Sequence, residues 1–176
     1  WSLIGEHNAY NALAAIIAAY DIGVTIEEAC SALTKFKSVK RRLECIFNAK
    51  GVQVYDDFAH HPTAIKKTLR ALRQHAGEGR LIAIMEPRSN TMRMGVHAKT
   101  LSSAFVDADL VLIFQADSVD WDIANNMNDL GTRCRVFTDI EKIISVIRQE
   151  HQQGDHIVIM SNGAFEGIHK KLIEIL

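Results

Sequence analysis

The chain has 176 residues, of which 48% are hydrophobic and 23% are charged, and its formal net charge at pH 7 is −1. This length and hydrophobic content suit one domain, or one domain and part of another, with a real core, and they exclude a disordered chain. The near-neutral charge argues against bulk attraction to nucleic acid or to an anionic membrane, so any phosphate must bind at a local site.

The cysteines are odd in number and far apart in sequence, at Cys30, Cys45 and Cys134. Without CxxC spacing, they predict reduced, buried thiols in a cytosolic protein rather than a disulfide framework or a zinc site. No apolar run reaches the length of a bilayer span, and the first residues lack the basic flank and cleavage pattern of a signal peptide. Because the chain has no initiator Met, we expect a piece of a longer protein.

Two helices are expected first. Residues 7–23, HNAYNALAAIIAAYDIG, are alanine-rich, have an apolar face and end at a glycine. That face carries Leu13, Ile16, Ile17 and Tyr20. Residues 25–36 begin with Thr25 and Glu28 at capping-box spacing. A basic loop, KSVKRRLE, follows, and we place a domain boundary within it, between residues 1–43 and residues 44–176.

After the linker, the spacing of the hydrophobic residues changes from a helical pattern to one typical of strands. Residues 43–58 read as a β-hairpin with its turn at residues 49–51. Strands are expected next at residues 80–87, 109–115, 134–137 and 156–163, and helices at residues 62–76, 96–108, 123–130, 139–151 and 164–176. Short apolar strands that alternate with helices predict an α/β fold with a mostly parallel, doubly wound sheet.

Four polar segments each follow a predicted strand: DDFAHHP, EPRSNT, QADS and SNGAFEG. Ligands of such sheets bind beyond the carboxyl ends of the strands, so all four segments should lie on one edge. In DDFAHHP, the carboxylates could meet ribose hydroxyls or a Mg²⁺-bound water, and the histidines an anion or an amine. Alternatively, Asp57 caps a turn and both histidines are surface residues. A metal site is a weaker alternative, since adjacent histidines rarely ligate one ion.

The other segments also leave two interpretations open. Asn8 and Asn11 could read the edge of a purine through paired donors and acceptors, or Asn8 could cap the helix while Asn11 is solvated. The arginines of KSVKRRLE suit phosphate, yet a solvated linker is the more common explanation of such a run. SNGAFEG could bind an anion at a helix start or be a plain strand–helix turn, because it lacks the full GxGxxG pattern.

In combination, GEHNAYNALAA, KRRLE, VYDDFAHHPTAI, EPRSNTM and MSNGAFEGIH resemble the Mur ligase family of bacterial cell-wall enzymes. The resemblance covers the whole chain and implies that residues 1–43 are the last helices of a central ATP-binding domain. Residues 44–176 would be the following Rossmann-like domain. No GxxxxGK[ST] motif occurs in the sequence. We therefore expect the phosphate-binding lysine and the main Mg²⁺ ligands to lie upstream, and this chain alone to be inactive.

The function implied is that of an ATP-dependent ligase. It would join UDP-N-acetylmuramate to the tripeptide L-alanyl-γ-D-glutamyl-meso-diaminopimelate through an acyl phosphate, in peptidoglycan recycling. ATP is the co-substrate and Mg²⁺ its companion ion. The alternatives are ligation to L-alanine alone, or a non-catalytic nucleotide-binding module. The implied location is the bacterial cytoplasm, with neither nucleic acid nor membrane as a partner.

The resemblance also implies site residues. The expected contacts of ATP are His7, Asn8, Asn11, Arg42 and Asp57. The expected contacts of the peptide are His60, Arg88, Ser89, Asp117 and Glu166. Asp57 and His60 are in addition the candidates for a direct catalytic part, and no resident metal site is expected in the chain. Ser38, Ala164 and Glu166 stand where the family usually has glycine; Glu166 would repel an anion, so we expect it to face the ammonium of diaminopimelate.

Overall fold

The computed structural model describes residue 1 and residues 3–176. Its centre is a six-stranded sheet with the strand order β1-β2-β6-β3-β4-β5. The strands are β1 (Glu44–Ala49), β2 (Val52–Asp57), β3 (Leu81–Met85), β4 (Leu110–Phe114), β5 (Cys134–Phe137) and β6 (His156–Met160). Only β1 runs antiparallel, in a hairpin with β2, and all other pairs are parallel. The predicted mostly parallel α/β sheet is confirmed.

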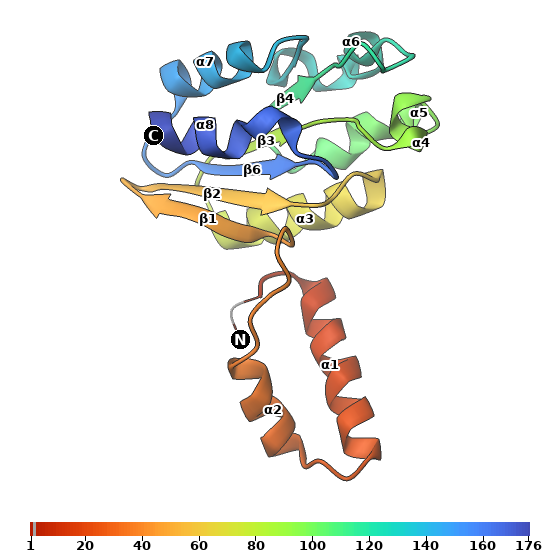
Figure 1. Cartoon of the computed structure of the whole chain (residues 1–176), viewed down its shortest axis with the longest axis vertical. Helices are drawn as coiled ribbons and strands as arrows, with labels where there is room; N and C mark the ends of the chain where they lie inside the picture. The colour runs from red at the N-terminus through yellow and green to blue at the C-terminus, as the bar shows by residue number, and fades with distance from the viewer. Residues whose placement is uncertain (2) are drawn as a thin grey trace.

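Helices flank the sheet on both faces (Figure 1). The helices of the described residues are α1 (Glu6–Asp21), α2 (Ile26–Thr34), α3 (Pro62–Ala76), α4 (Asn90–Arg93), α5 (Ala98–Leu101), α6 (Ile123–Asn126), α7 (Ile140–Glu150) and α8 (Ile168–Ile175), of which α3 to α8 belong to the sheet domain. Three 3-10 turns add η1 (Ser102–Phe105), η2 (Asn128–Arg133) and η3 (Phe165–Gly167). The helix predicted over residues 96–108 is shorter in the structure, where α5 passes directly into the 3-10 turn η1. Thr100 and Ser103 donate their hydroxyls to carbonyls three residues earlier, which competes with regular α-helical bonding.

Each face of the sheet has its own core. On one face, Leu81, Ala83 and Met85 of β3 pack in a cluster that includes residues of α3. On the other, Ile82 and Ile84 join a cluster with residues of α7 and α8. Every residue of β3 is buried. A strand covered on both faces reads as a continuous apolar run, which explains LIAIM.

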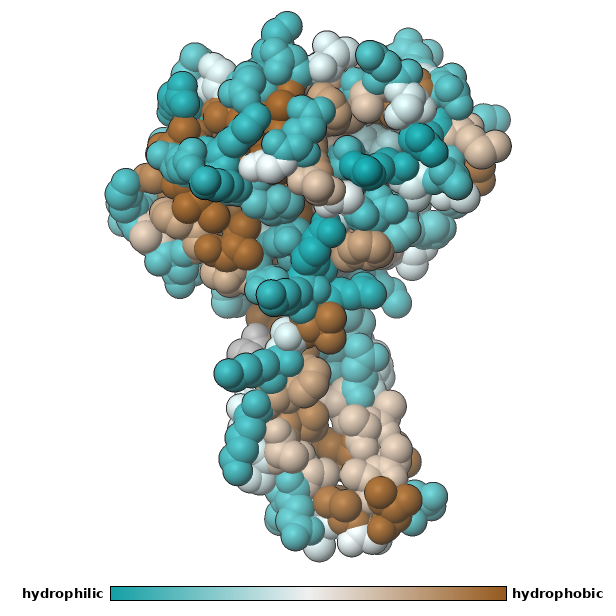
Figure 2. All heavy atoms as spheres, viewed as in Figure 1, coloured by the Kyte–Doolittle hydropathy of each residue, from teal (hydrophilic) through white to brown (hydrophobic). Residues whose placement is uncertain are grey.

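The two N-terminal helices form a hairpin that projects from the sheet domain (Figure 1). The capping box of Thr25 and Glu28 at the start of α2 is present as predicted. In contrast, α1 has no buried residue, and the side chains of Leu13, Ile17 and Tyr20 are 52%, 59% and 64% exposed. Figure 2 shows apolar side chains on the surface of this hairpin. The apolar face of α1 is thus not covered by the described residues.

The cysteines differ from expectation. All three are free thiols, but Cys30 and Cys45 are exposed and Cys134 is half-buried, so the prediction of buried thiols is wrong. Cys30 lies on the little-buried α2, and Cys45 lies on the edge strand β1, where few elements can cover a side chain. Among the described residues, none of the helices combines the length and apolarity needed to traverse a bilayer.

Candidate functional site

A pocket of about 700 Å³ lies where the helical hairpin meets the sheet domain. Its walls come from α1, α2, the linker before β1, the end of β2 and α3. All five residues that the sequence suggested for ATP line it: His7, Asn8, Asn11, Arg42 and Asp57. Residues separated by as many as fifty positions in the sequence therefore share one cavity.

Several lining residues were not found by sequence reasoning. Trp1 and Phe36 stack with ring centroids 5.9 Å apart and planes 15° from parallel, which gives the pocket an aromatic wall. Lys67 and Thr68 line it from α3. Their spacing of three and four residues from Ala64, another lining residue, could have placed them on one helix face.

Asp57 joins the linker to the sheet. One carboxylate oxygen, Oδ2, accepts the backbone N–H of Leu43 at 2.7 Å. The other accepts the N–H of Ala59 at 2.8 Å and the hydroxyl of Thr68 at 3.3 Å. Burial raises the pKa of Asp57, and these hydrogen bonds, with the charge of Arg42, oppose that rise. The turn-capping alternative is therefore realised, and a contact with ribose stays a prediction.

The pocket favours an anion next to an apolar group. Arg42 and Lys67 bring positive charge, and Asp57 is the one carboxylate among the lining residues that the structure describes. Because each of its oxygens already accepts a protein hydrogen bond, its charge is partly compensated. His7 stands between these groups. Burial, followed by Lys67, lowers the pKa of His7, and Asp57 raises it.

The two asparagines are ordered within α1. Asn8 donates its amide to the carbonyl of Ile4 at 2.8 Å, and Asn11 lies 3.5 Å from the Oδ1 of Asn8. The helix is preceded by Gly5 at the N-cap position, without a side-chain cap. Asn8 therefore does not cap α1, and that alternative is wrong. Both asparagines line the same pocket.

The residues do not fit a resident Mg²⁺ ion. Within residues 1 and 3–176, no group of three or more His, Cys, Asp or Glu side chains is arranged to hold a metal. Asp57 already accepts protein donors on both oxygens. Of the adjacent histidines, His61 accepts the N–H of Thr63 at 3.2 Å as the N-cap of α3, and His60 lies 3.0 Å from the carbonyl of Phe58.

A second polar surface follows β6 and β3 on the same sheet edge. Glu86, which is buried, accepts the hydroxyl of Ser161 at 2.5 Å, and that hydroxyl accepts the N–H of Gly163 at 2.9 Å. Arg88 lies 3.7 Å from the Glu86 carboxylate and crosses directly over Gly163. A Cβ atom at position 163 would collide with the Arg88 side chain. The half-exposed guanidinium is thus held over the loop and open to solvent.

The other residues predicted to contact the peptide are not brought together with Arg88 in the same way. Ser89 precedes α4, with its hydroxyl 3.3 Å from that of Thr91. Asp117 and Glu166 are both exposed. Glu166 lies near Lys171 of α8, whose pKa is raised by Glu141 first and by Glu166 more weakly. Their part in binding stays a prediction.

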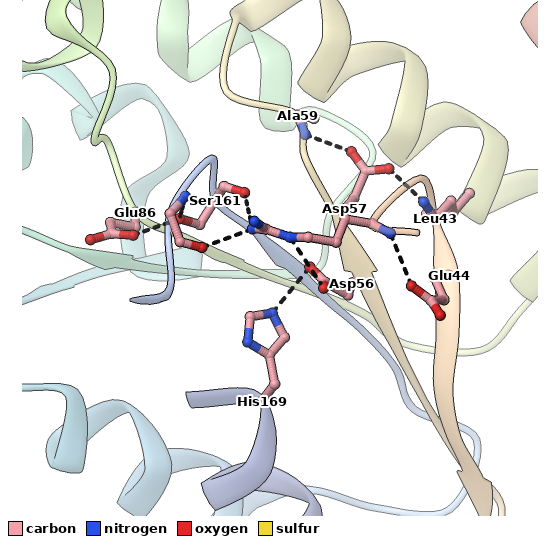
Figure 3. A network of polar contacts seen from close by, with 10 residues as sticks. Leu43, Glu44, Asp56, Asp57, Ala59, Glu86, Ser161 and His169 are labelled. Atoms are coloured by element: carbon pink, nitrogen blue, oxygen red, sulfur yellow. Dashed lines mark hydrogen bonds and ion pairs between the residues drawn. The ribbon is translucent and has the colours of Figure 1, made fainter. Parts of the chain in front are cut away.

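A network of polar contacts connects this surface to the linker (Figure 3). It runs from Glu86 through Ser161 to Arg41, and on through Asp56 to His169. Burial opposes ionisation of Asp56, but His169 and then Arg41 hold its pKa below the usual value. The sequence patterns include Arg41 and Asp56 in their polar segments, but the predicted site residues are their neighbours Arg42 and Asp57 alone.

Comparison with known proteins agrees with this architecture. Residues 41–163 match the family model described as Mur ligase, glutamate ligase domain. Over the whole chain, the sequence is 45% identical to the UDP-N-acetylmuramate--L-alanyl-gamma-D-glutamyl-meso-2,6-diaminoheptandioate ligase of Haemophilus influenzae, of which it covers 39%. A UDP-N-acetylmuramate--L-alanine ligase of Bartonella tribocorum is 32% identical over 92% of the chain and 36% of the relative.

A solved structure gives the same result. The crystal structure of a murein peptide ligase from Psychrobacter arcticus superposes with a TM-score of 0.75 at 43% identity, covering 99% of this chain and 38% of that one. The chain spans well under half the length of each of these relatives. The family model covers most of the sheet domain and begins at Arg41, the first arginine of the linker. The chain therefore belongs to the Mur ligase family.

Proposed function

We propose that the chain is the C-terminal part of an ATP-dependent ligase that joins UDP-N-acetylmuramate to L-alanyl-γ-D-glutamyl-meso-diaminopimelate. The relative at 45% identity is named for this reaction, whereas the alanine ligase is 32% identical. Residues 1–43 would then complete a central ATP-binding domain, and residues 44–176 would be the domain that presents the amine. The place of such an enzyme is peptidoglycan recycling in the bacterial cytoplasm.

The chemistry needs both substrates held close together. A carboxylate and an amine do not condense unaided at neutral pH. Transfer of the γ-phosphoryl group of ATP to the muramate carboxylate gives an acyl phosphate and ADP. The peptide α-amine then attacks the acyl carbon, and the tetrahedral intermediate expels phosphate as the amide forms. Holding the amine against the acyl phosphate supplies proximity, and exclusion of water prevents hydrolysis.

In this proposal the pocket at the helical hairpin binds ATP. The aromatic wall of Trp1 and Phe36 offers a stacking surface for adenine, and the amides of Asn8 and Asn11 offer donors and acceptors for its edge. Arg42, together with Lys67, would meet the phosphates and Asp57 the ribose, while His7 would lie with the two asparagines on the adenine side. Mg²⁺ would be held mainly by residues outside this chain.

The loops after β3, β4 and β6 would bind the peptide. Arg88 presents a planar fork suited to a carboxylate of the tripeptide. Ser89, which follows Arg88, and His60, which follows β2 at the same sheet edge, would also contact the peptide. Asp117 or Glu166 would pair with the ammonium group at the diaminopimelate end.

One observation carries the proposal: the residues suggested for ATP converge on one pocket that combines an aromatic wall with two cations. The test is ligation by the full-length protein, followed as ADP release and amide product with UDP-N-acetylmuramate, Mg·ATP and either tripeptide or L-alanine. We expect tripeptide to be the preferred amine, and the 176-residue chain alone to show no turnover. Preference for L-alanine would favour the alternative ligase. Nucleotide binding without ligation by the full-length protein would favour a non-catalytic module.

A further inference from the structure

Two adjacent arginines of the linker both lie over the ring of Phe58, but their other surroundings differ. Arg42 lines the pocket at the helical hairpin. The guanidinium of Arg41 instead donates from Nη2 to the carbonyls of Ser161 at 2.6 Å and Gly163 at 2.9 Å. Its Nε lies 3.4 Å from the carboxylate of Asp56. The side chain of Arg41 is therefore committed to the sheet edge.

The backbone of Arg41 is fixed as firmly as its side chain. Its N–H donates to the carboxylate of Glu44 at 2.9 Å, and its carbonyl accepts the N–H of Phe58 at 2.8 Å. Both Arg41 and Leu43 have left-handed backbone conformations, with φ of 59° and 51°. Such conformations are costly for residues other than glycine, and they persist where surrounding contacts impose them.

The loop that Arg41 holds is the one that supports Arg88. Gly163 lies directly beneath the Arg88 side chain, and the hydroxyl of Ser161 donates to Glu86, the carboxylate nearest to Arg88. Two carbonyls of this loop accept hydrogen bonds from one cation. A shift of the loop would therefore move the surface on which Arg88 rests.

We infer that Arg41 is a positioning residue for the amine substrate: it fixes the loop of residues 161–163 so that Arg88 is presented for a peptide carboxylate. This inference rests on the proposed function. It divides the neighbouring arginines between the two substrates, with Arg42 acting on ATP and Arg41 acting on the peptide through Arg88.

The test compares Arg41→Ala with Arg42→Ala in the full-length enzyme, with Michaelis constants measured separately for ATP and tripeptide. Loss of charged hydrogen bonds to two loop carbonyls should raise KM for the tripeptide roughly tenfold or more. KM for ATP should stay within about twofold, as expected for a residue that does not line the pocket. Arg42→Ala should show the reverse pattern. Circular dichroism melts of both variants report any general loss of folding.

Arg41→Lys keeps the testing possible if Arg41→Ala does not fold. Lysine keeps the positive charge, but one ammonium group cannot place a donor at the two loop carbonyls and another at Asp56, as Nη2 and Nε of Arg41 do, so the variant should show the same split at smaller size. The inference is overturned if Arg41 variants change KM for ATP as much as KM for the tripeptide, or leave both unchanged. Absence of ligation by the unsubstituted enzyme would instead remove the proposed function, and the inference with it.

Discussion

The helical hairpin and the sheet domain differ in how they are stabilised. The central strands β3 and β4 of the sheet are buried between two helical layers and have no exposed residue. By contrast, α1 has no buried residue and carries exposed Leu13, Ile17 and Tyr20. Burial of apolar area is the main favourable term in folding, so the sheet domain has its own source of stability and the hairpin has little. The pocket lies where the two meet, so one of its walls belongs to a well-buried domain and the other to a little-buried hairpin.

The largest effect should come from a cavity in the sheet. Ile84 of β3 is fully buried, and Ile84→Ala should lower the free energy of unfolding of the chain by about 2–5 kcal/mol. The matched control is Ile17→Ala in α1, where the side chain is 59% exposed and the loss should be about 0.5 kcal/mol or less. Urea denaturation of both variants measures this difference. Equal losses would show that the hairpin is as well packed as the sheet.

The next effect concerns the peptide. Arg88→Ala in the full-length enzyme should raise KM for the tripeptide by roughly 30- to 1,000-fold, because a charge-assisted contact is lost. KM for ATP should change far less. If Arg88 only makes an ion pair with Glu86, the melting temperature falls and both Michaelis constants hold. If KM for ATP rises most, Arg88 belongs to the nucleotide site.

The pocket is tested by Arg42→Ala and by Asp57→Asn in the full-length enzyme. Each should lower kcat/KM for ATP by roughly 100-fold or more if its contact strengthens in the transition state. Asp57→Asn also loses one acceptor for the N–H groups of Leu43 and Ala59, so its melting temperature must be recorded alongside. A variant within twofold of the parent removes that residue from the nucleotide site.

A smaller effect is expected from Gly163→Ala. The added methyl group meets the flexible side chain of Arg88, so the guanidinium should be displaced at little cost in stability. We expect KM for the tripeptide to rise roughly tenfold, as for the loss of one hydrogen bond to a charged group, with KM for ATP unchanged. Unaltered kinetics would mean that the Arg88 guanidinium keeps its position or has no part in binding.

The smallest effect is the titration of His7. Its pKa is lowered from 6.5, mainly by burial, so the folded state binds the proton more weakly than the unfolded state. The lowered pKa of His7 contributes to the free energy of unfolding. This contribution is fully present above pH 6.5 and is lost as the pH falls from 6.5 through the folded-state pKa. A bound phosphate should raise that pKa. NMR titration of His7 with and without ATP measures both values, and a free-state pKa at or above 6.5 would contradict the account.

The two regions also differ in how far the sequence predicts them. Strand–helix alternation predicts the parallel sheet, because LIAIM and LVLIF have no polar face and must be covered on both sides. The helical pattern over residues 96–108 does not show that the helix is shorter and changes from α to 3-10 form after Leu101, next to the hydroxyls of Thr100 and Ser103 that donate to backbone carbonyls. The sequence also does not predict that Leu13 and Tyr20 are exposed, because an apolar helix face does not identify the surface that packs against it.

For the site, the family motifs selected residues that line one pocket. The motifs did not predict that Arg41 and Arg42 have different contacts. Adjacent residues of the same type differ only in the direction in which their side chains point, and a sequence motif does not give that direction. That direction is set by the left-handed conformations of Arg41 and Leu43, which non-glycine residues rarely adopt and sequence patterns do not signal. Lys67 was overlooked because it reads as a solvated lysine on an amphipathic helix.

The most direct test of the central claim is a crystal structure of the full-length protein with a non-hydrolysable ATP analogue. The account predicts that the nucleotide occupies the pocket at the helical hairpin, with its base beside Asn8 and Asn11 and its phosphates reaching Arg42. A nucleotide bound elsewhere, with these three side chains free of contact, would contradict it.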